Sequence, residues 1–128
     1  MSPRLKQYLD EHPQMCQTVA MDFDIGGGAG AWYVGHLVQG PEVVASAHVA
    51  IWDKAGMRHH KEARESAATF MSDYGIDRLV SEVPIDNFLA QAFAQRVGLR
   101  RVGVLRSRPF ADGSRQHVVM YEAVKGEL

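Results

Sequence analysis

Cysteine is nearly absent from this 128-residue chain, which has a single one, Cys16. One cysteine cannot form a disulfide within the chain, so we expect a reducing, intracellular setting. Long apolar runs are absent too: none approaches the roughly 20 residues that a membrane-spanning helix needs, and the N-terminus lacks the apolar region of a secretory signal. These absences predict a soluble, cytoplasmic protein without a membrane partner.

An excess of charge of either sign is also missing, because 14 basic residues stand against 15 acidic ones. This balance argues against a protein that coats nucleic acid through bulk electrostatics, so a nucleic-acid partner is not expected. Any basic function must be local. The length suits one domain with its own hydrophobic core.

The glycine-rich residues 26–31 contain a G-x-G-x-x-A pattern, which is typical of a dinucleotide-binding loop. That loop requires a helix directly after it, whereas residues 32–38 are β-branched, aromatic and interrupted by glycine. We therefore expect a loop that enters a strand.

Hydrophobic periodicity predicts the remaining elements. Strands are expected over residues 32–38, 43–52 and 77–84 and, in a closing hairpin, over 101–108 and 116–124. Helices are expected over 3–9, over 60–74, and from an N-cap at Asp86 or Asn87 to Gly98. Residues 15–25 suit a strand or a helix, and the sequence leaves that choice open.

Three of these elements have an apolar side that should meet the core. In strand 43–52 it consists of Val43, Ala45, Ala47, Val49 and Ile51. In helix 60–74 it consists of Ala63, Ala67, Phe70, Met71 and Tyr74, and in the next helix of Leu89, Ala92, Phe93 and Val97. Strands interspersed with helices predict a mixed α/β (α+β) fold, with strands 43–52 and 79–83 parallel across a helical crossover.

A short basic segment lies between strand 43–52 and the following helix. Residues 58–64 hold three basic side chains and one acidic one, a net charge of +2. Unpaired backbone N–H groups and the positive end of the helix dipole converge at such a position, so we expect an anion site there. The alternative is a solvated helix start. His59 and His60 do not predict a metal site, because adjacent helical residues do not face one another and no third ligand is evident.

The stretch from Arg58 to Ala63 joins a predicted strand to a helix, Asn87 opens the next helix, and Gly98 ends it. In this arrangement the chain resembles the GNAT family of acetyl-CoA-dependent N-acyltransferases, whose coenzyme loop has the pattern Q/R-x-x-G-x-G/A. The likeness is strongest over residues 43–124 and faint before residue 32. The pattern is most similar to the short family members found in phages and prophages.

The resemblance implies a GNAT-like acyltransferase fold, in which helices flank a central mixed, mostly antiparallel sheet. It implies one domain over residues 1–128 with an atypical, short N-terminal region over 1–31. It also implies acetyl-CoA as cosubstrate, no metal, and an amine acceptor that attacks the thioester directly. The backbone of the central strand, near residues 49–52, would hold the acyl carbonyl. The residues that it assigns to coenzyme binding are Ile51, Trp52, Arg58, His59, His60, Lys61, Ala63, Asn87 and Phe93.

Two positions depart from the family pattern. Lys61 replaces the central glycine of the coenzyme loop, so its side chain must point away or replace a backbone contact with phosphate. Ala94 stands where many members have a tyrosine that protonates the departing thiolate. A thiol has a pKa of about 8.5, so a thiolate is a fair leaving group near neutrality, and losing a general acid costs roughly 10²–10⁴-fold. Activity could survive through positioning or another residue.

The candidates for the general base are Glu82, in strand 77–84, and His48, in strand 43–52. Glu82 would take the amine proton directly or through water, and the alternative is an outward strand carboxylate. His48 is of a residue type that titrates near neutrality, and its alternative is a structural role. Tyr121 and His117 share one face of the last strand and could line the acceptor cleft, although apolar neighbours on that face favour a core position for Tyr121.

Two functions fit the sequence. The first is transfer of an acetyl group from acetyl-CoA to an amine of a protein or small molecule. The alternative is a GNAT-fold binding or structural protein with impaired catalysis, for which Lys61 and Ala94 are the evidence. A homodimer is expected in that case, because an incomplete sheet edge invites pairing.

Overall fold

The computed structural model describes residues 7, 10–11, 20–23, 30–51, 59–110 and 112–128, with only the backbone described over 20–23, 30–37 and 48–51. The glycine-rich residues 26–29, Trp52 and Arg58 lie outside the described residues. So does the N-terminal helix expected over residues 3–9, except for Gln7; Gln7, Asp10 and Glu11 are helical.

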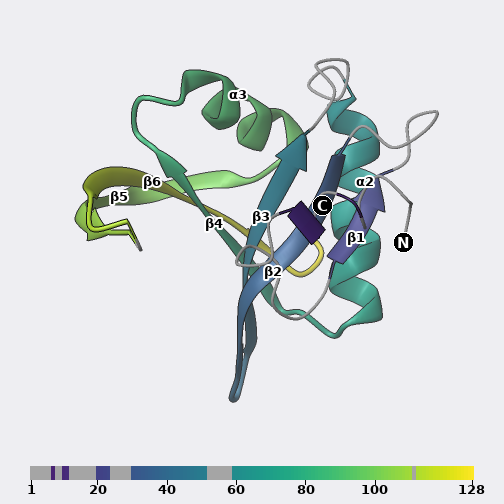
Figure 1. Ribbon diagram of the computed structural model, residues 1–128. Helices are drawn as coiled ribbons and strands as arrows, with labels where there is room; N and C mark the ends of the chain where they lie inside the picture. Colours follow the sequence, from purple (N-terminus) through teal and green to yellow (C-terminus); the bar gives the residue numbers. More distant parts are fainter. Residues whose placement is uncertain (1–6, 8–9, 12–19, 24–29, 52–58, 111) are drawn as a thin grey trace.

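Within the described part of the chain, six strands form one sheet in the order β1-β2-β3-β4-β6-β5 (Figure 1). Adjacent strands are antiparallel except β3 and β4, which are parallel. This confirms the mixed, mostly antiparallel sheet, and it assigns part of the ambiguous segment 15–25 to a strand. The bounds are β1 Ala20–Phe23, β2 Gly30–Gln39, β3 Val43–Ile51, β4 Arg78–Pro84, β5 Arg100–Pro109 and β6 Arg115–Val124.

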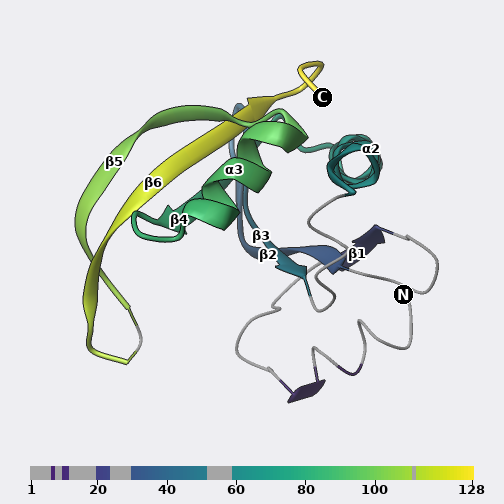
Figure 2. The same ribbon diagram turned by 90° about the horizontal axis from the view of Figure 1, so that it is seen from above.

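Helices α2 (His60–Asp73) and α3 (Phe88–Val97) lie on the same side of the curved sheet (Figure 2). Helix α2 connects β3 to β4 and packs against β1 and β2, while α3 connects β4 to β5. Gly98 ends α3 in the left-handed conformation, with φ of 110°. The positive φ favours glycine here, and a Cβ would lie 3.2 Å from the side-chain ends of Arg64 and Leu128, which would have to shift slightly.

The core lies between the helices and one face of the sheet, which we call the inner face. The apolar face predicted for β3 is confirmed at Ala45 and Ala47, both fully buried. Small and branched side chains of the strands meet the apolar stripes of the helices there. The buried residues of this layer are Ala45, Ala47, Leu79, Ser81, Val83, Val119, Tyr121 and Ala123 from the strands, and Ala63, Ala67, Phe70, Met71, Phe93, Ala94 and Val97 from the helices.

The core positions predicted for two residues are wrong. Tyr74 is 50% exposed, because it is the C-cap of α2, and its ring packs in a T-shaped arrangement with that of Phe70, at 5.3 Å between centroids. Leu89 is 74% exposed in the first turn of α3, where no described residue covers it. The side of α3 that faces the sheet carries Phe93, Ala94 and Val97, so Ala94 is buried instead of Leu89.

Candidate active site

Strands β3 and β4 separate after a short parallel ladder. Among the described residues they pair at three positions, and Ser46 with Val80 is the last. Strand β3 continues along β2 to Ile51 and β4 continues along β6 to Pro84, so the facing edges of residues 47–51 and 81–84 have no described strand partner. Figure 1 shows the two strands diverging, an arrangement that we call the fork. Peptide groups on such edges can bond to an extended ligand.

Polar contacts hold the other end of the fork together. The Asp77 N–H donates to the Val43 carbonyl at 2.9 Å, and the Val43 N–H donates to Asp77 Oδ2 at 2.8 Å. The Arg78 guanidinium bridges Glu122, at 2.6 Å, and Glu42, at 3.1 Å. Hydrogen bonds to these carboxylates, that to Glu122 first, raise the pKa of Arg78 above its usual value. The strands are therefore joined firmly at one end and part at the other.

Both helices begin at the open end of the fork, since α2 follows β3 and α3 follows β4 (Figure 1). The N-cap of α3 is Asn87, whose Oδ1 accepts the Ala90 N–H at 3.1 Å. The N-cap of α2 is His59, whose side chain makes no capping hydrogen bond and lies 3.5 Å from Glu62. The first turn of α2 thus lacks a side-chain cap, which suits it to an anionic ligand.

The opposite face of the sheet, which we call the outer face, carries Glu82 beside the fork. Its carboxylate is ion-paired with the guanidinium of Arg108, and the two side chains are 20% and 37% exposed. Arg108 also lies over the ring of Phe110, 5.1 Å from the centroid. Glu82 therefore lies on the outward side of β4, as the alternative reading of the sequence had it, and is ion-paired there rather than fully solvated. The sequence pattern does not indicate a role for Arg108, because its register partner is Gln116, far along the hairpin.

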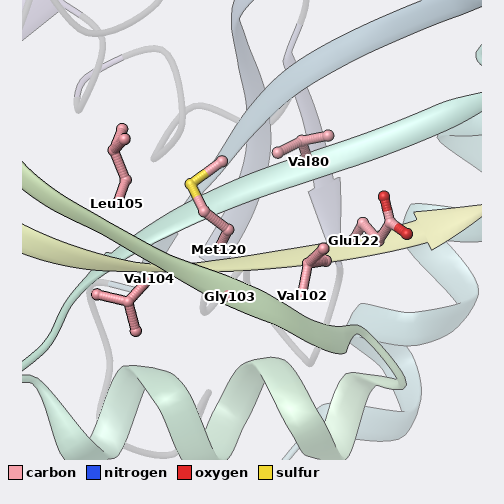
Figure 3. Close-up of a pocket in the computed structure, with 7 residues that line it drawn as sticks. All are labelled: Val80, Val102, Gly103, Val104, Leu105, Met120 and Glu122. Atoms are coloured by element: carbon pink, nitrogen blue, oxygen red, sulfur yellow. The ribbon is translucent and has the colours of Figure 1, made fainter.

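A pocket of about 340 Å³ opens on the outer face beside the point where β3 and β4 part (Figure 3). Figure 3 shows the side chains of Met120, Glu122 and Leu105 extending on the side of the strands opposite α3. The lining is apolar except for one carboxylate, and Val80 belongs to the last β3–β4 pair. The lining residues are Val80, Val102, Gly103, Val104, Leu105, Met120 and Glu122.

No family model and no curated protein matches the chain, but solved structures do. The microcin C7 self-immunity acetyltransferase MccE, in complex with acetyl-CoA and AMP, matches with a TM-score of 0.60 and 20% identity over 77% of this chain and 55% of that chain. Mycobacterium smegmatis RimJ, in complex with CoA-disulfide, matches with a TM-score of 0.67 and 18% identity over 80% and 50%. A GNAT-family acetyltransferase from Bacillus anthracis matches with a TM-score of 0.63 and 13% identity over 78% and 60%.

This chain has the GNAT fold. This confirms the fold that the sequence predicted. At these sequence identities, the matches show the fold alone. The chain spans 50% of the RimJ chain and 55% of the MccE chain.

The coenzyme residues expected from the GNAT pattern fall into three groups. His59, His60 and Lys61 lie together at the start of α2, with His60 and Lys61 exposed, whereas Ala63 is fully buried beneath them. Lys61 is an ordinary helical residue without a positive φ, so this loop does not need glycine at that position for its backbone. The lysine therefore adds charge to the start of the helix without strain.

Residues of α3 and β3 make up the other two groups. Asn87 uses its side-chain oxygen as the cap of α3, and Phe93 is 2% exposed within the core, so any contact of Phe93 with a coenzyme would come from the inner face. His48 and Ile51 lie in the β3 backbone on the arm of the fork, and their side chains are not described. Trp52 and Arg58 lie outside the described residues.

The two remaining candidates share a strand and differ in environment. His117 is exposed, and its Nδ1 accepts the N–H of Ser107, a residue with φ of 54° in a bulge of β5, at 2.9 Å. Tyr121 is fully buried, which confirms the expected core position, and no described residue forms a hydrogen bond with its hydroxyl.

No group of three or more histidine, cysteine, aspartate or glutamate side chains among the described residues could hold a metal ion. None of the described helices is both long and apolar enough to cross a membrane.

The pocket itself was not predicted from the sequence. Strand alternation offered part of the signal, because Met120 and Glu122 alternate with residues on the core side of β6. The contribution of β5 had no such signal, since a bulge between Arg101 and Gly103 shifts its register.

Proposed function

We propose that this chain is an acetyl-CoA-dependent N-acetyltransferase that moves an acetyl group to an amine of a protein or small molecule. The observation that carries the proposal is the fork, with the start of α2 at its open end. The matched structures support the proposal, because MccE is in complex with acetyl-CoA and AMP, and RimJ is in complex with CoA-disulfide.

In this proposal the coenzyme pyrophosphate binds at the start of α2. The first-turn N–H groups and the side chains of His60, Lys61 and Arg58 would meet its charge. The amide-containing arm of the coenzyme would then run between the edges of residues 47–51 and 81–84 and bond to peptide groups that no described strand uses. A backbone N–H near Ile51 and Trp52 would hold the thioester carbonyl, where negative charge develops.

The acceptor amine would approach the thioester from the outer face, on which Glu82 lies. Its lone pair attacks the carbonyl carbon, the C–S bond breaks with its electron pair on sulfur, and the proton of the new ammonium passes to Glu82 directly or through water. Because a carboxylate has two oxygens with about four lone-pair sites, the pair with Arg108 leaves room for that proton. Arg108 then holds the base in place.

The pocket of the outer face is the proposed site for the body of the acceptor. Its apolar lining and one carboxylate, Glu122, fit an amine that carries an apolar substituent. A Gly103→Val variant tests this assignment, because a Cβ at Gly103 meets no atom within 4 Å and would narrow the pocket rather than disturb the fold. We expect a higher KM for the acceptor and an unchanged affinity for acetyl-CoA. If Gly103→Val and wild type have equal KM values for each acceptor tested, the pocket is not part of the acceptor site.

Titration of the protein with acetyl-CoA, followed by calorimetry and thermal unfolding, tests the function. A ligand at 100 times its dissociation constant adds about 2.7 kcal/mol to the free energy of unfolding. Release of free thiol in the presence of a panel of protein and small-molecule amines then reports turnover. No binding at millimolar acetyl-CoA would overturn the proposal.

The second candidate is a GNAT-fold binding protein with impaired catalysis. Ala94 and the engagement of Glu82 by Arg108 favour it, because both reduce the acid and base available for the reaction. Coenzyme binding without thiol release from any amine would support this function instead. Homodimerisation and membership of a phage-type group stay predictions.

A further inference from the structure

A bulge in β5 decides which face of the sheet the Arg108 side chain occupies. Leu105 pairs with Val118 and Arg108 pairs with Gln116, so β5 carries one residue more than β6 over this interval. Without the extra residue, Arg108 would lie opposite Arg115 instead. A shift by one residue moves every following side chain of a strand to the other face of the sheet. The bulge therefore determines the side on which the guanidinium of Arg108 lies.

The side that the bulge selects is the outer face, on which Glu82 lies. Glu82 pairs with Met120 of β6, and Gln116 shares the face of Met120, because side chains alternate along the regular strand β6. Cross-strand partners share a face as well, so Arg108 lies with Gln116 on the side of Glu82. The ion pair of Arg108 with Glu82 thus depends on the bulge. In the unshifted register, Arg108 would face a second guanidinium, that of Arg115.

Ser107, which lies in the bulge directly before Arg108, has an uncommon backbone conformation. Its φ is 54°, the one positive φ of a non-glycine residue in the described part of the chain. Such a conformation is strained and persists where the surrounding structure holds it. Two side chains of β6 bind its peptide groups: the Ser107 N–H donates to His117 Nδ1 at 2.9 Å, and the Ser107 carbonyl accepts from Arg115 Nη1 at 2.9 Å. The bulge is therefore attached to β6 at both groups.

His117 provides the more rigid of these two attachments. Its imidazole has two side-chain torsions, whereas the long arginine side chain loses more rotamer freedom when it is held. For Nδ1 to accept a hydrogen bond, the ring of a neutral imidazole must carry its proton on Nε2. The backbone of His117 is held too, because its carbonyl accepts the N–H of Ile85, directly after β4, at 3.0 Å. His117 thus connects the end of the strand that carries Glu82 to the bulge that orients Arg108.

We propose that His117 is a positioning residue, which holds the bulge of β5 in the register that places Arg108 against Glu82. The part of this inference that concerns catalysis rests on the proposed function, in which Glu82 is the base. With the Ser107 N–H bound to Nδ1, the guanidinium stays at the carboxylate, and the carboxylate stays where the amine would lose its proton. His117 itself exchanges no proton with the substrate, so it acts through Arg108 alone.

NMR tests the geometry without coenzyme or acceptor. The ring nitrogens of His117 in the wild-type protein should have the chemical shifts of the tautomer that is protonated at Nε2. The Arg108 Nε–H signal should move when Glu82→Gln removes the charge of its partner. In a His117→Ala background this response to Glu82→Gln should be smaller, because the bulge is no longer held in its register.

Two further backgrounds separate the hydrogen bond from other effects of the histidine. His117→Asn places an amide oxygen where Nδ1 lies and should keep the Arg108 response, whereas His117→Gln, whose oxygen lies one bond further out, is the matched control and should not. Ser107→Gly should restore the response in His117→Ala, because glycine adopts a positive φ without strain and the bulge then needs no ring to hold it.

Turnover provides the second readout. His117→Ala should lower kcat for thiol release by about two- to tenfold, which corresponds to the loss of one hydrogen bond, with an unchanged KM for acetyl-CoA. In an Arg108→Gln background, His117→Ala should cause no further loss, because the side chain that it positions is absent. A merely structural histidine would cause the same loss in both backgrounds.

The outcomes distinguish this inference from the proposed function. A His117 ring protonated at Nδ1, or an Arg108 response that is the same in wild type and His117→Ala, would overturn the positioning role while turnover stays intact. Equal losses of kcat from His117→Ala with and without Arg108 would overturn it as well. If the wild-type protein releases no thiol with any amine, the proposed function fails, and the NMR response of Arg108 still decides whether His117 positions it.

Discussion

The carboxylate of Glu82 and the guanidinium of Arg108 are ion-paired on the outer face of the sheet, beside the point where β3 and β4 part. In the proposed reaction, the pair would hold a carboxylate where the amine approaches the thioester. The two residues would have different roles: Glu82 would accept the amine proton, and Arg108 would hold the Glu82 carboxylate in place. Variants of each therefore have different expected effects.

Replacing Glu82 by glutamine should lower kcat for thiol release by roughly 10²–10⁴-fold, because the amide cannot take the amine proton. The affinity for acetyl-CoA should stay the same. Arg108→Gln keeps the carboxylate and removes its anchor, so kcat should fall by less than in Glu82→Gln. Steady-state kinetics with one acceptor compare the two variants. A normal rate in Glu82→Gln together with a loss in His48→Ala would transfer the role of base to β3.

Lys61 should contribute to coenzyme affinity through its charge at the start of α2. Charges at helix ends contribute typically 0.3–1 kcal/mol, so Lys61→Ala should weaken acetyl-CoA binding by about two- to fivefold. The loss should shrink at high salt, because the side chain is exposed. Lys125→Ala, which alters an exposed lysine after β6, is the control and should leave the affinity unchanged in calorimetry. Equal affinities for wild type and Lys61→Ala would move the pyrophosphate site away from α2.

The parts of this site that could be predicted from the sequence are those set by local interactions. The cap at Asn87 and the end of α3 at Gly98 depend on neighbouring backbone groups, and both have recognisable residue types. The fork has no local signal, because its residues continue two regular strands and only the pairing between them stops. The same holds for the Glu82–Arg108 pair, which depends on two register shifts in β5 and on the reach of the Arg108 side chain across β6 to β4.

The two cap candidates of α3 can be separated by stability. Asn87 accepts the Ala90 N–H, whereas no capping bond is found for Asp86 among the described residues. Asn87→Ala should therefore lower the free energy of unfolding by about 1 kcal/mol, as the loss of an N-cap typically does. Asp86→Ala, at an exposed neighbouring position, should stay within about 0.5 kcal/mol of wild type. Urea unfolding measures both, and a larger loss from Asp86→Ala would contradict the assigned cap.

The turn between β5 and β6 should make stability depend on acid pH. The Ser114 hydroxyl donates to Asp112 Oδ1 at 2.6 Å and the Ser114 N–H donates at 2.9 Å, and these bonds, the hydroxyl first, lower the pKa of Asp112. A carboxyl with a lowered folded pKa stabilises the fold above its unfolded value, about 3.9, and this contribution is lost as the pH falls through the folded value. Ser114→Ala removes the hydroxyl bond and keeps that of the backbone N–H, so it should raise the Asp112 pKa part of the way toward its ordinary value in an NMR titration. The stability difference between wild type and variant should shrink below about pH 4. Ser72→Ala, on an exposed face of α2, should leave the Asp112 pKa unchanged, and an equal shift in both variants would rule out the turn as its cause.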